Sequence, residues 1–336
     1  MTRHPLLDVR DLTVEYGRGR TAFRAVDGVS LSVAEGETVG LVGESGSGKS
    51  TIGRAVVGLA AATAGSVTFD GEDITRATRR RRRQLSAALQ MMFQDPYSSL
   101  NPARTVGDSL VEPLLARRDV EPRRRRELIE AALRRVGLPA DTAQRYPAHF
   151  SGGQRQRIVL ARALVGTPRL VICDEPVSAL DVSVQAQVIN LLADLQAELG
   201  LSYLFIAHDL AVVRHLSHRV VVLYRGQVME SGPAETVYSR PAHPYTRALI
   251  AAAPVPDPAR ARTGADSPVL PDRPAERSAP AGGSGCRFAT RCPYVVDECT
   301  RRRPPLTQAW SGSQVACLRQ REIADLARPK VASMAH

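Results

Sequence analysis

The chain has 336 residues, of which 43% are hydrophobic, and a formal net charge of +11. This length allows one large or two medium domains with ordinary cores. No apolar run approaches the roughly 18 residues that a membrane helix needs, and no long apolar segment follows the N-terminus as in a signal peptide. We therefore expect the protein to stay in the cytoplasm unless it docks on a membrane component.

Nearly all of the positive charge comes from arginine, with basic runs at residues 79–83, 123–126 and 301–303. Such runs can mark a surface for nucleic acid or anionic lipid. The alternative is a solvated surface. We favour this alternative and expect no nucleic-acid partner, because no aromatic residues are interleaved with the runs and the aromatic content is only 4%.

The N-terminal part of the chain contains short stretches in which apolar and polar residues nearly alternate, at residues 6–9, 12–16, 29–33 and 65–71. These stretches predict an antiparallel sheet. The apolar run at 38–42 predicts a buried strand beside that sheet, and residues 51–59 predict a helix.

The sequence GESGSGKS lies between this strand and this helix, at residues 43–50. Two glycines separated by four residues and followed by Lys-Ser, in a strand–loop–helix context, form the P-loop pattern. The glycines let backbone N–H groups turn towards a phosphate, and the helix N-terminus and Lys49 add positive charge. A chance glycine-rich loop is the alternative, against which the matching flanks argue. The expected phosphate-binding residues are Gly43, Glu44, Ser45, Gly46, Ser47, Gly48, Lys49, Ser50 and Thr51.

Helical periodicity dominates between about 95 and 165, whereas strands and helices alternate from Leu170 onwards. The latter part contains buried strands at 170–173 and 202–207, an amphipathic helix at 183–199, and a hairpin at 220–230. The sequence therefore predicts an α/β fold. Its core is a P-loop NTPase (RecA-like) unit with an antiparallel β subdomain and a helical insertion subdomain.

Two carboxylates, Asp174 and Glu175, follow the buried strand at 170–173. The carboxyl ends of strands face the ligand crevice of an open α/β sheet. Asp174 can hold Mg²⁺ directly or through water, beside the Ser50 hydroxyl. Glu175 is placed to orient and deprotonate an attacking water. A pair of surface acids capping a helix is the alternative, against which the preceding apolar strand argues.

The segment FSGGQRQR, at residues 150–157, places a serine and two glycines before a helix that runs to Val165. This is a second seat for an anion. With this segment the sequence resembles the ABC-transporter ATPase family over residues 6–253, although Phe150 stands where the family has Leu. The resemblance implies ATP and Mg²⁺ as cofactors and a head-to-tail dimer, in which this segment completes the other subunit's ATP site. The segment's nucleotide-binding residues would be Ser151, Gly152, Gly153 and Gln154.

The resemblance also implies roles for individual residues. Tyr16 would stack on adenine, and Asp181 would belong to the D-loop. Gln94 would reach Mg²⁺ and the lytic water, and His208 would touch the γ-phosphate. The implied catalytic set is Lys49, Gln94, Glu175 and His208, and the implied Mg²⁺ set is Ser50, Gln94 and Asp174.

Three strings narrow the resemblance: MMFQDPYSSLNP at 91–102, CDEPVSALDVSVQAQV at 173–188 and HPYTRAL at 243–249. They are similar to the oligopeptide and dipeptide importers, and to the second of the two ATPase subunits of such importers. This implies an ATPase that powers peptide import from the cytoplasmic face of the inner membrane. Its partners would be a related ATPase subunit, two transmembrane permeases and, indirectly, a solute-binding protein.

Other functions remain open at this point. Related importers of nickel or glutathione are the alternative within the family. A soluble ABC ATPase acting on nucleic acid or ribosomes is the alternative from another class, but it would carry two cassettes or a long coiled coil. A regulatory module that senses metal or redox state is the third, against which the intact Lys49, Asp174, Glu175 and His208 argue.

Residues 254–285 are rich in Pro, Ala, Arg and Gly and predict a linker between the cassette, residues 1–253, and a small Cys-rich extension at 286–336. The extension holds Cys286, Cys292, Cys299 and Cys317. A cytosolic setting disfavours disulfides. A structural zinc site usually contains at least one Cys-x₂₋₄-Cys pair, and these four cysteines include none. A four-cysteine iron–sulfur cluster tolerates looser spacing.

The extension also resembles the C-terminal extension of peptide-importer ATPases, which implies a [4Fe–4S] cluster. Zn²⁺ and four unrelated free thiols are the alternatives. Nothing in the sequence places this unit near the ATP, so we expect its role to be structural or regulatory. Cys173 differs from these four cysteines, because it lies in a buried strand and is expected to be a core residue.

Overall fold

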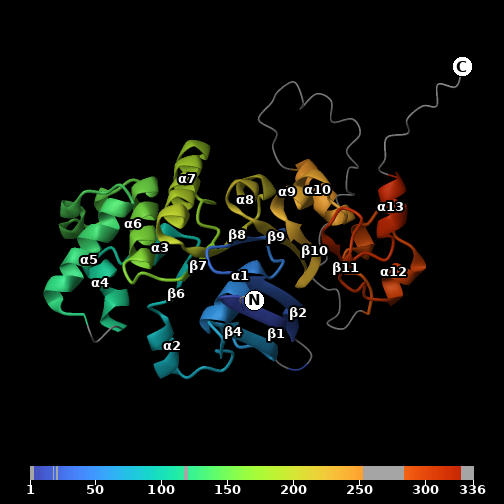
Figure 1. Ribbon diagram of the computed structural model, residues 1–336, viewed down its shortest axis with the longest axis horizontal. Coiled ribbons are helices and arrows are strands. Elements are labelled where there is room, and N and C mark those ends of the chain that lie inside the picture. Colours follow the sequence, from blue (N-terminus) through green and yellow to red (C-terminus); the bar gives the residue numbers. More distant parts are fainter. Residues whose placement is uncertain (1–3, 18, 20–21, 117–119, 253–283, 327–336) are drawn as a thin grey trace, which may run out of the picture.

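The computed structural model describes residues 4–17, 19, 22–116, 120–252 and 284–326. Two sheets organise these residues (Figure 1). The smaller sheet is antiparallel and has the strand order β2-β1-β4-β5. Its strands are β1 (Leu7–Tyr16), β2 (Phe23–Val33), β4 (Ala64–Phe69) and β5 (Glu72–Asp73).

The larger sheet has the strand order β11-β12-β10-β9-β3-β8-β7-β6. The strands from β9 to β6 in this order are parallel, and those from β11 to β9 pair antiparallel. The strands are β3 (Thr38–Val42), β6 (Leu89–Met92), β7 (Leu170–Asp174), β8 (Ser202–Ala207), β9 (Arg219–Tyr224), β10 (Gln227–Pro233), β11 (Thr307–Gln308) and β12 (Gln314–Val315). The α/β fold with an antiparallel β subdomain is thus confirmed.

The two short strands that the sequence predicted at 6–9 and 12–16 are one strand, β1, which begins at Leu7. The pairing of β1 with β2 shifts register between Val9 and Leu12. Asp11 lies at this irregularity with a φ of +46°, a left-handed conformation that Asp tolerates better than most residues. The strand therefore passes through the polar interruption instead of ending at it.

Helices cover the larger sheet and form a separate block at one side of it (Figure 1). Those beside the sheets are α1 (Lys49–Val57), α2 (Arg79–Leu85), α7 (Val182–Leu199), α8 (Leu210–Leu216), α9 (Ala234–Ser239) and α10 (Pro244–Ala252). The block contains α3 (Pro96–Ser99), α4 (Val106–Val111), η2 (Glu112–Ala116), α5 (Pro122–Arg135), η3 (Ala140–Gln144), η4 (Pro147–His149) and α6 (Gly152–Leu164). No helix among the described residues is both long and apolar enough to cross a bilayer.

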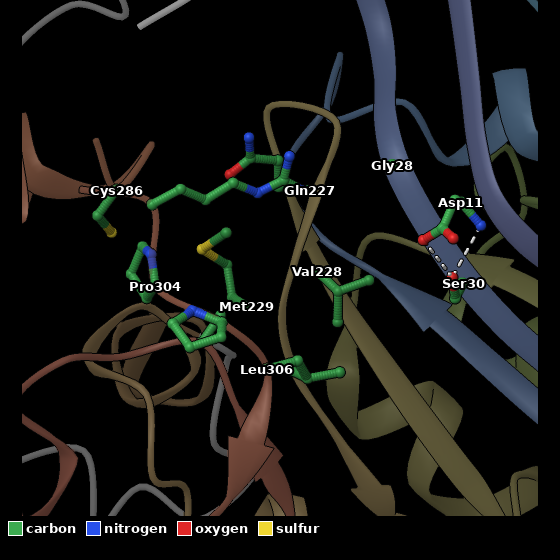
Figure 2. A pocket seen from close by; sticks show the side chains of 12 residues that line it. Asp11, Gly28, Ser30, Gln227, Val228, Met229, Cys286, Pro304 and Leu306 are labelled. Carbon is green, nitrogen blue, oxygen red and sulfur yellow. Dashed lines mark hydrogen bonds between the residues drawn. The ribbon is translucent and has the colours of Figure 1, made fainter. Parts of the chain in front are cut away.

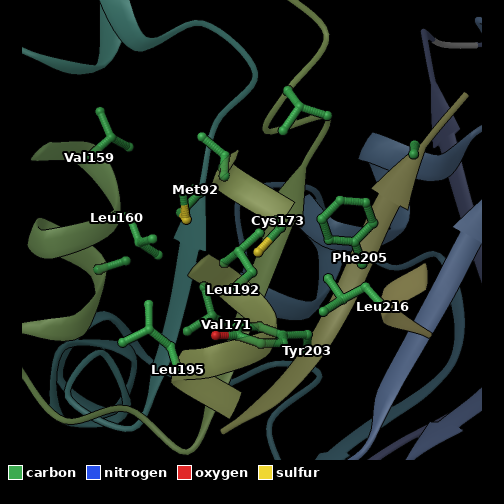
Figure 3. Packing of buried hydrophobic residues seen from close by; sticks show 14 of the residues in the cluster. Met92, Val159, Leu160, Val171, Cys173, Leu192, Leu195, Tyr203, Phe205 and Leu216 are labelled. Atoms are coloured by element: carbon green, nitrogen blue, oxygen red, sulfur yellow. The ribbon is translucent and has the colours of Figure 1, made fainter. Parts of the chain in front are cut away.

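The core of the larger sheet is apolar on both faces, as expected for parallel strands. Every residue of β7 and β8 is buried. On one face, Val171 and Cys173 of β7 lie with Tyr203 and Phe205 of β8 beneath α7 (Figure 3). Alternate residues of the same strands pack on the other face, against α1 and the smaller sheet. Cys173 is 0% exposed, so its assignment to the core is confirmed.

Arginines of all three basic runs pair with neighbouring carboxylates. In the first run, Arg81 binds Glu72, while Arg82 donates to the backbone carbonyl of Val56 at 2.6 Å and to that of Ile74. In the third run, Arg303 donates to the backbone carbonyl of Asp27 at 2.8 Å. Some arginines of these runs therefore hold separate elements together and do not merely form a solvated surface.

The described part of the extension, residues 286–326, continues the larger sheet of the cassette. It contains η6 (Ala289–Arg291), α12 (Asp297–Arg301), β11, β12 and α13 (Gln320–Leu326). Strand β12 pairs with β10, with Val315 opposite Glu230. The Ser313 hydroxyl donates to the buried Glu230 carboxylate at 2.8 Å. The expected linker at 254–285 falls almost entirely outside the described residues.

Candidate functional site

Four neighbouring parallel strands bring most of the predicted catalytic residues to one edge of the larger sheet. The phosphate loop, residues 43–50, follows β3, and Gln94 comes two residues after β6. Glu175 directly follows β7, and His208 directly follows β8. Because these strands are adjacent in the order β3-β8-β7-β6, their carboxyl ends open onto one crevice.

The two outer glycines of the phosphate loop are required by close backbone approaches. A Cβ on Gly43 would lie 2.1 Å from the carbonyl oxygen of Leu223. A Cβ on Gly48 would lie 2.4 Å from the carbonyl oxygen of Ala25, and Gly48 has a φ of +103°. Only glycine fits such positions. A Cβ on Gly46, in contrast, would meet nothing within 4 Å, so the middle of the loop faces open space.

Lys49 is the first residue of α1 and is only 3% exposed. Its ammonium donates to the carbonyls of Gly43 at 2.8 Å and Glu44 at 2.9 Å. Burial lowers the pKa of Lys49, and the nearby Glu175 carboxylate, 3.9 Å away, opposes this shift. The ammonium therefore spans the mouth of the loop, where a phosphate would find a charged donor.

The Ser50 hydroxyl donates to Oδ1 of Asp174 at 2.6 Å, so these two predicted Mg²⁺ ligands lie together. Asp174 is 2% exposed, and burial raises its pKa despite the hydrogen bond from Ser50. A buried carboxylate beside a hydroxyl suits a hard cation, and Mg²⁺ typically takes one or two protein oxygens and completes its shell with water and phosphate. The two residues therefore fit a Mg²⁺ ion shared with a nucleotide.

The carboxylate of Glu175 is the point where the other predicted catalytic groups meet. Gln94 donates to its Oε2 at 3.0 Å, and Nδ1 of His208 lies 3.7 Å from the same oxygen. Glu175 has a φ of +47°, a strained conformation for a non-glycine residue. Ser178 donates to the Glu175 carbonyl at 3.0 Å and thereby supports this turn.

The segment 151–154 belongs to a different part of the molecule from the phosphate loop. Ser151 caps α6 and accepts from the Gln154 amide at 3.4 Å, while the Gln154 side chain accepts from the Ser151 amide at 3.0 Å. Gly152 and Gly153 form the first turn of this helix. Helix α6 packs on α3, α4, α5, α7 and β6, whereas α1 packs on β2, β6, β7 and β8. The two predicted anion seats therefore lie at the starts of two different helices, which share only β6 as a common neighbour among these elements.

Three further predicted residues lie at or near the ends of their elements. Asp181 caps α7 and accepts from the Val184 amide at 2.9 Å, a hydrogen bond that lowers the pKa of this carboxyl. Tyr16 ends β1, where it pairs with Phe23, and is 44% exposed. An exposed ring at a strand end is available for stacking. Thr51 lies in the first turn of α1.

The four cysteines of the extension lie near one another. The Cys286 amide donates to the Cys299 carbonyl at 2.7 Å, and Cys286 and Cys292 flank the short helix η6. Burial raises the pKa of Cys286 and Cys317 to about 11, and the neighbouring thiols add to this shift. Within the described ranges, no group of three or more His, Cys, Asp or Glu side chains is arranged to hold a metal ion. The arrangement thus gives no support to a zinc site or to the expected cluster.

The extension reaches the phosphate loop, although nothing in the sequence placed it near this site. Arg291 donates to both carboxylate oxygens of Glu44 at 2.9 Å. The Tyr245 hydroxyl accepts from the Glu44 amide at 2.9 Å. Tyr245 lies in the HPYTRAL string and could have been singled out there. Arg291 carries no local signal, because it lies 247 residues from its partner.

A cavity of about 340 Å³ lies between the smaller sheet, β10 and the extension (Figure 2). Gln227 and Met229 line it from β10, and Arg303 and Leu306 line it from the extension. Its lining includes Cys286 and Arg303, which the sequence singled out, but none of the residues predicted to bind ATP or to act in catalysis. This cavity is therefore distinct from the crevice at the strand ends.

Comparisons with known proteins match both the cassette and the extension. The family model of ABC transporters matches residues 26–178, and the model of the oligopeptide/dipeptide transporter C-terminal region matches residues 229–299. A Brucella ovis protein named as a peptide import ATP-binding protein is 49% identical, over 95% of this chain and 99% of its own length. The oligopeptide transport ATP-binding protein OppF of Salmonella typhimurium is 47% identical, over 94% of this chain and 97% of its own length.

Solved structures also resemble the cassette. The dimeric ATP-binding cassette MJ0796, in a post-hydrolysis state with ADP and Pi, is 28% identical and gives a TM-score of 0.61. The matched region covers 68% of this chain and 98% of that one. CbiO1 from Clostridium perfringens, part of the transporter complex cbiONQ, is 27% identical with a TM-score of 0.63, over 71% of this chain and 92% of its own.

Proposed function

This chain belongs to the ABC transporter family of ATP-binding proteins, and from that membership we propose that it hydrolyses ATP to power the import of oligopeptides or dipeptides. The likeness to peptide-import proteins at 47–49% identity extends over the extension as well as the cassette. It therefore favours peptides over nickel or glutathione as the imported solute. It also favours a transporter subunit over an ATPase acting on nucleic acid or ribosomes.

One observation supports ATP hydrolysis most strongly, namely the meeting of the four predicted catalytic side chains at the phosphate loop. The Glu175 carboxylate lies 3.0 Å from Gln94 Nε2, 3.7 Å from His208 Nδ1 and 3.9 Å from Lys49 Nζ. A carboxylate so placed can take a proton from water, while an amide and an imidazole orient that water and a terminal phosphate. Such a constellation has a catalytic purpose rather than a purely structural one.

The residues divide the work of the proposed reaction. Lys49 and the amides of the phosphate loop bind and orient the phosphates, and Tyr16 stacks on the base. Ser50 and Asp174 would hold Mg²⁺, which supplies charge neutralisation when bound. Glu175 accepts a proton from the attacking water. Gln94 and His208 position the water and the γ-phosphate.

The site of one chain is incomplete by itself in this proposal, because the anion seat at 151–154 belongs to the helical block. We propose that it faces the phosphate loop of a second ATPase subunit across a shared ATP. The likeness to a dimeric cassette supports this arrangement. ATP would then close the dimer, and hydrolysis with loss of phosphate would let it reopen, as in other switches driven by a γ-phosphate.

Co-expression with two permeases and a related ATPase from adjacent reading frames tests the proposed transport function. We expect a complex on the cytoplasmic face of the membrane, whose ATPase rate rises when a peptide-loaded binding protein is added to vesicles. Nickel-loaded and glutathione-loaded binding proteins are the matched controls. Stimulation by one of these solutes but not by peptides would contradict the proposed substrate, and a failure to join any permease would contradict the transport role.

We also propose, as a separate matter, that the four cysteines of the extension hold a [4Fe–4S] cluster, with Zn²⁺ as the alternative. The proposal rests on the spacing of the four cysteines in the sequence and on the match of the extension to the oligopeptide/dipeptide transporter C-terminal region, because the described side chains form no metal site as they lie. Thiolates are needed as ligands, so binding would have to offset the raised pKa values of Cys286 and Cys317. Protein purified without oxygen is expected to be brown and to lose its visible absorbance in Cys286→Ser. A colourless wild type without iron would contradict the proposal.

A further inference from the structure

Arg291 connects the extension to the phosphate loop through a partly buried ion pair. Its Nη1 lies 2.9 Å from both carboxylate oxygens of Glu44, and its side chain is 18% exposed. The guanidinium carbon lies 5.9 Å from the centre of the Tyr224 ring and 6.0 Å from that of Phe288. Because two rings limit its freedom, this arginine is better ordered for pairing than one on an open surface.

Glu44 is held through its backbone as well as its side chain. Its amide donates to the Tyr245 hydroxyl at 2.9 Å. Its carbonyl accepts from Lys49 Nζ at 2.9 Å and from the Ser47 amide at 3.2 Å. A shift of Glu44 would therefore move an atom that contacts the Lys49 ammonium, the main charged group of the loop.

We propose that Arg291 is a positioning residue for the phosphate loop, so that the affinity of this chain for ATP depends on its C-terminal extension. This inference rests on the proposed role of residues 43–50 in binding ATP. Arg291 does not contact the nucleotide. It fixes the side chain of Glu44, and Glu44 in turn fixes the start of the loop and the carbonyl that Lys49 contacts.

The same contact links the cysteines to the ATP site. Arg291 is the last residue of η6, and its amide donates to the Phe288 carbonyl at 3.0 Å. The Ala289 amide donates to the Cys286 carbonyl at 3.1 Å, and the Cys292 amide donates to the Ala289 carbonyl at 3.4 Å. A change in the distance between Cys286 and Cys292 would therefore move Arg291. A change in the conformation of the extension around these cysteines can thus change the affinity of the cassette for ATP.

The experiment uses the full chain in its transporter complex and compares Arg291→Ala, Glu44→Gln and the double variant with wild type. We expect the KM for ATP to rise about 5- to 20-fold in Arg291→Ala, which is within the range usual for coupling between two sites. We expect kcat to stay within about twofold, because no group that contacts the reacting atoms is changed. The KM of the double variant should not exceed that of the single variant with the higher KM, because both substitutions break the same ion pair.

Arg302→Ala is the matched control, because Arg302 is an exposed arginine of the same extension that pairs with Glu298 at 3.4 Å. It should leave the KM unchanged, and Arg291→Lys should recover part of the affinity lost in Arg291→Ala. A loss of folded protein would lower kcat at constant KM, which differs from the expected result. An unchanged KM in Arg291→Ala, or additive losses in the double variant, would overturn the inference. Failure of the wild type to bind ATP would instead refute the proposed function.

Discussion

Glu175→Gln is expected to lower steady-state ATP hydrolysis by about 10²- to 10⁴-fold, the usual contribution of a general base. The substitution keeps the size of the side chain and its position beside Gln94 and His208, but removes the group that accepts a proton from water. ATP should still bind, because Lys49 and the phosphate loop are unchanged. The variant is therefore expected to accumulate as a closed ATP-bound dimer with its partner subunit, measured by size-exclusion chromatography in ATP and in ADP.

Glu198→Gln provides the matched control, since it makes the same substitution at an exposed position of α7. This control should hydrolyse ATP at the wild-type rate and form no persistent dimer. Near-normal hydrolysis by Glu175→Gln would refute the assignment of Glu175 as the base. Loss of hydrolysis together with loss of ATP binding would also count against it, because the role assigned to Glu175 is in the chemical step.

Lys49→Ala is expected to weaken ATP binding by about 10²-fold or more, because an ammonium that donates to phosphate oxygens makes charged hydrogen bonds worth about 1.5–3 kcal/mol each. The change also removes the ammonium that lies 3.9 Å from the Glu175 carboxylate, so the empty site becomes more negative and less receptive to a polyphosphate. Titration with a fluorescent ATP analogue measures the effect. The affinity of this variant for ADP should decrease as well.

AMP serves as the control ligand for this variant, because it lacks the phosphates that Lys49 is proposed to bind. Its weak affinity should therefore change much less than that of ATP. Lys49→Arg keeps the charge but adds volume at a position that is only 3% exposed, so we expect an intermediate affinity. Equal ATP affinity in wild type and Lys49→Ala would contradict the proposed role of the lysine.

Much of the cassette could be predicted from the sequence because its elements carry repeating local signals. The continuous apolar residues of β7 and β8 and the period of α7 marked these elements to within one residue. The phosphate loop was recognisable because its chemistry requires fixed residue types at fixed spacing. Glu175 could be placed because it follows a buried strand whose end faces the ligand crevice of the sheet, whereas the role of His208 was implied by the family resemblance.

The parts that could not be predicted depend on contacts between distant residues. Strand β12 has only two residues, too few for any alternation to be visible, and it becomes a strand by pairing with β10. The continuity of β1 depends on the left-handed conformation of Asp11, which its neighbours in sequence do not dictate. In the sequence Arg291 looks like any other arginine of an arginine-rich chain. Only the residues that surround it in the folded protein distinguish it.

The anchors of Glu44 also set an order of events during synthesis of the chain. Tyr245 follows Glu44 by 201 residues and Arg291 follows it by 247. At about 5–20 residues per second, the ribosome delivers Arg291 roughly 12 to 50 s after the phosphate loop. A nascent cassette therefore folds around a loop that lacks its last anchor. In this view, translation of the C-terminal residues is the step that matures the nucleotide site, and a prematurely terminated chain would be a poor competitor for cellular ATP.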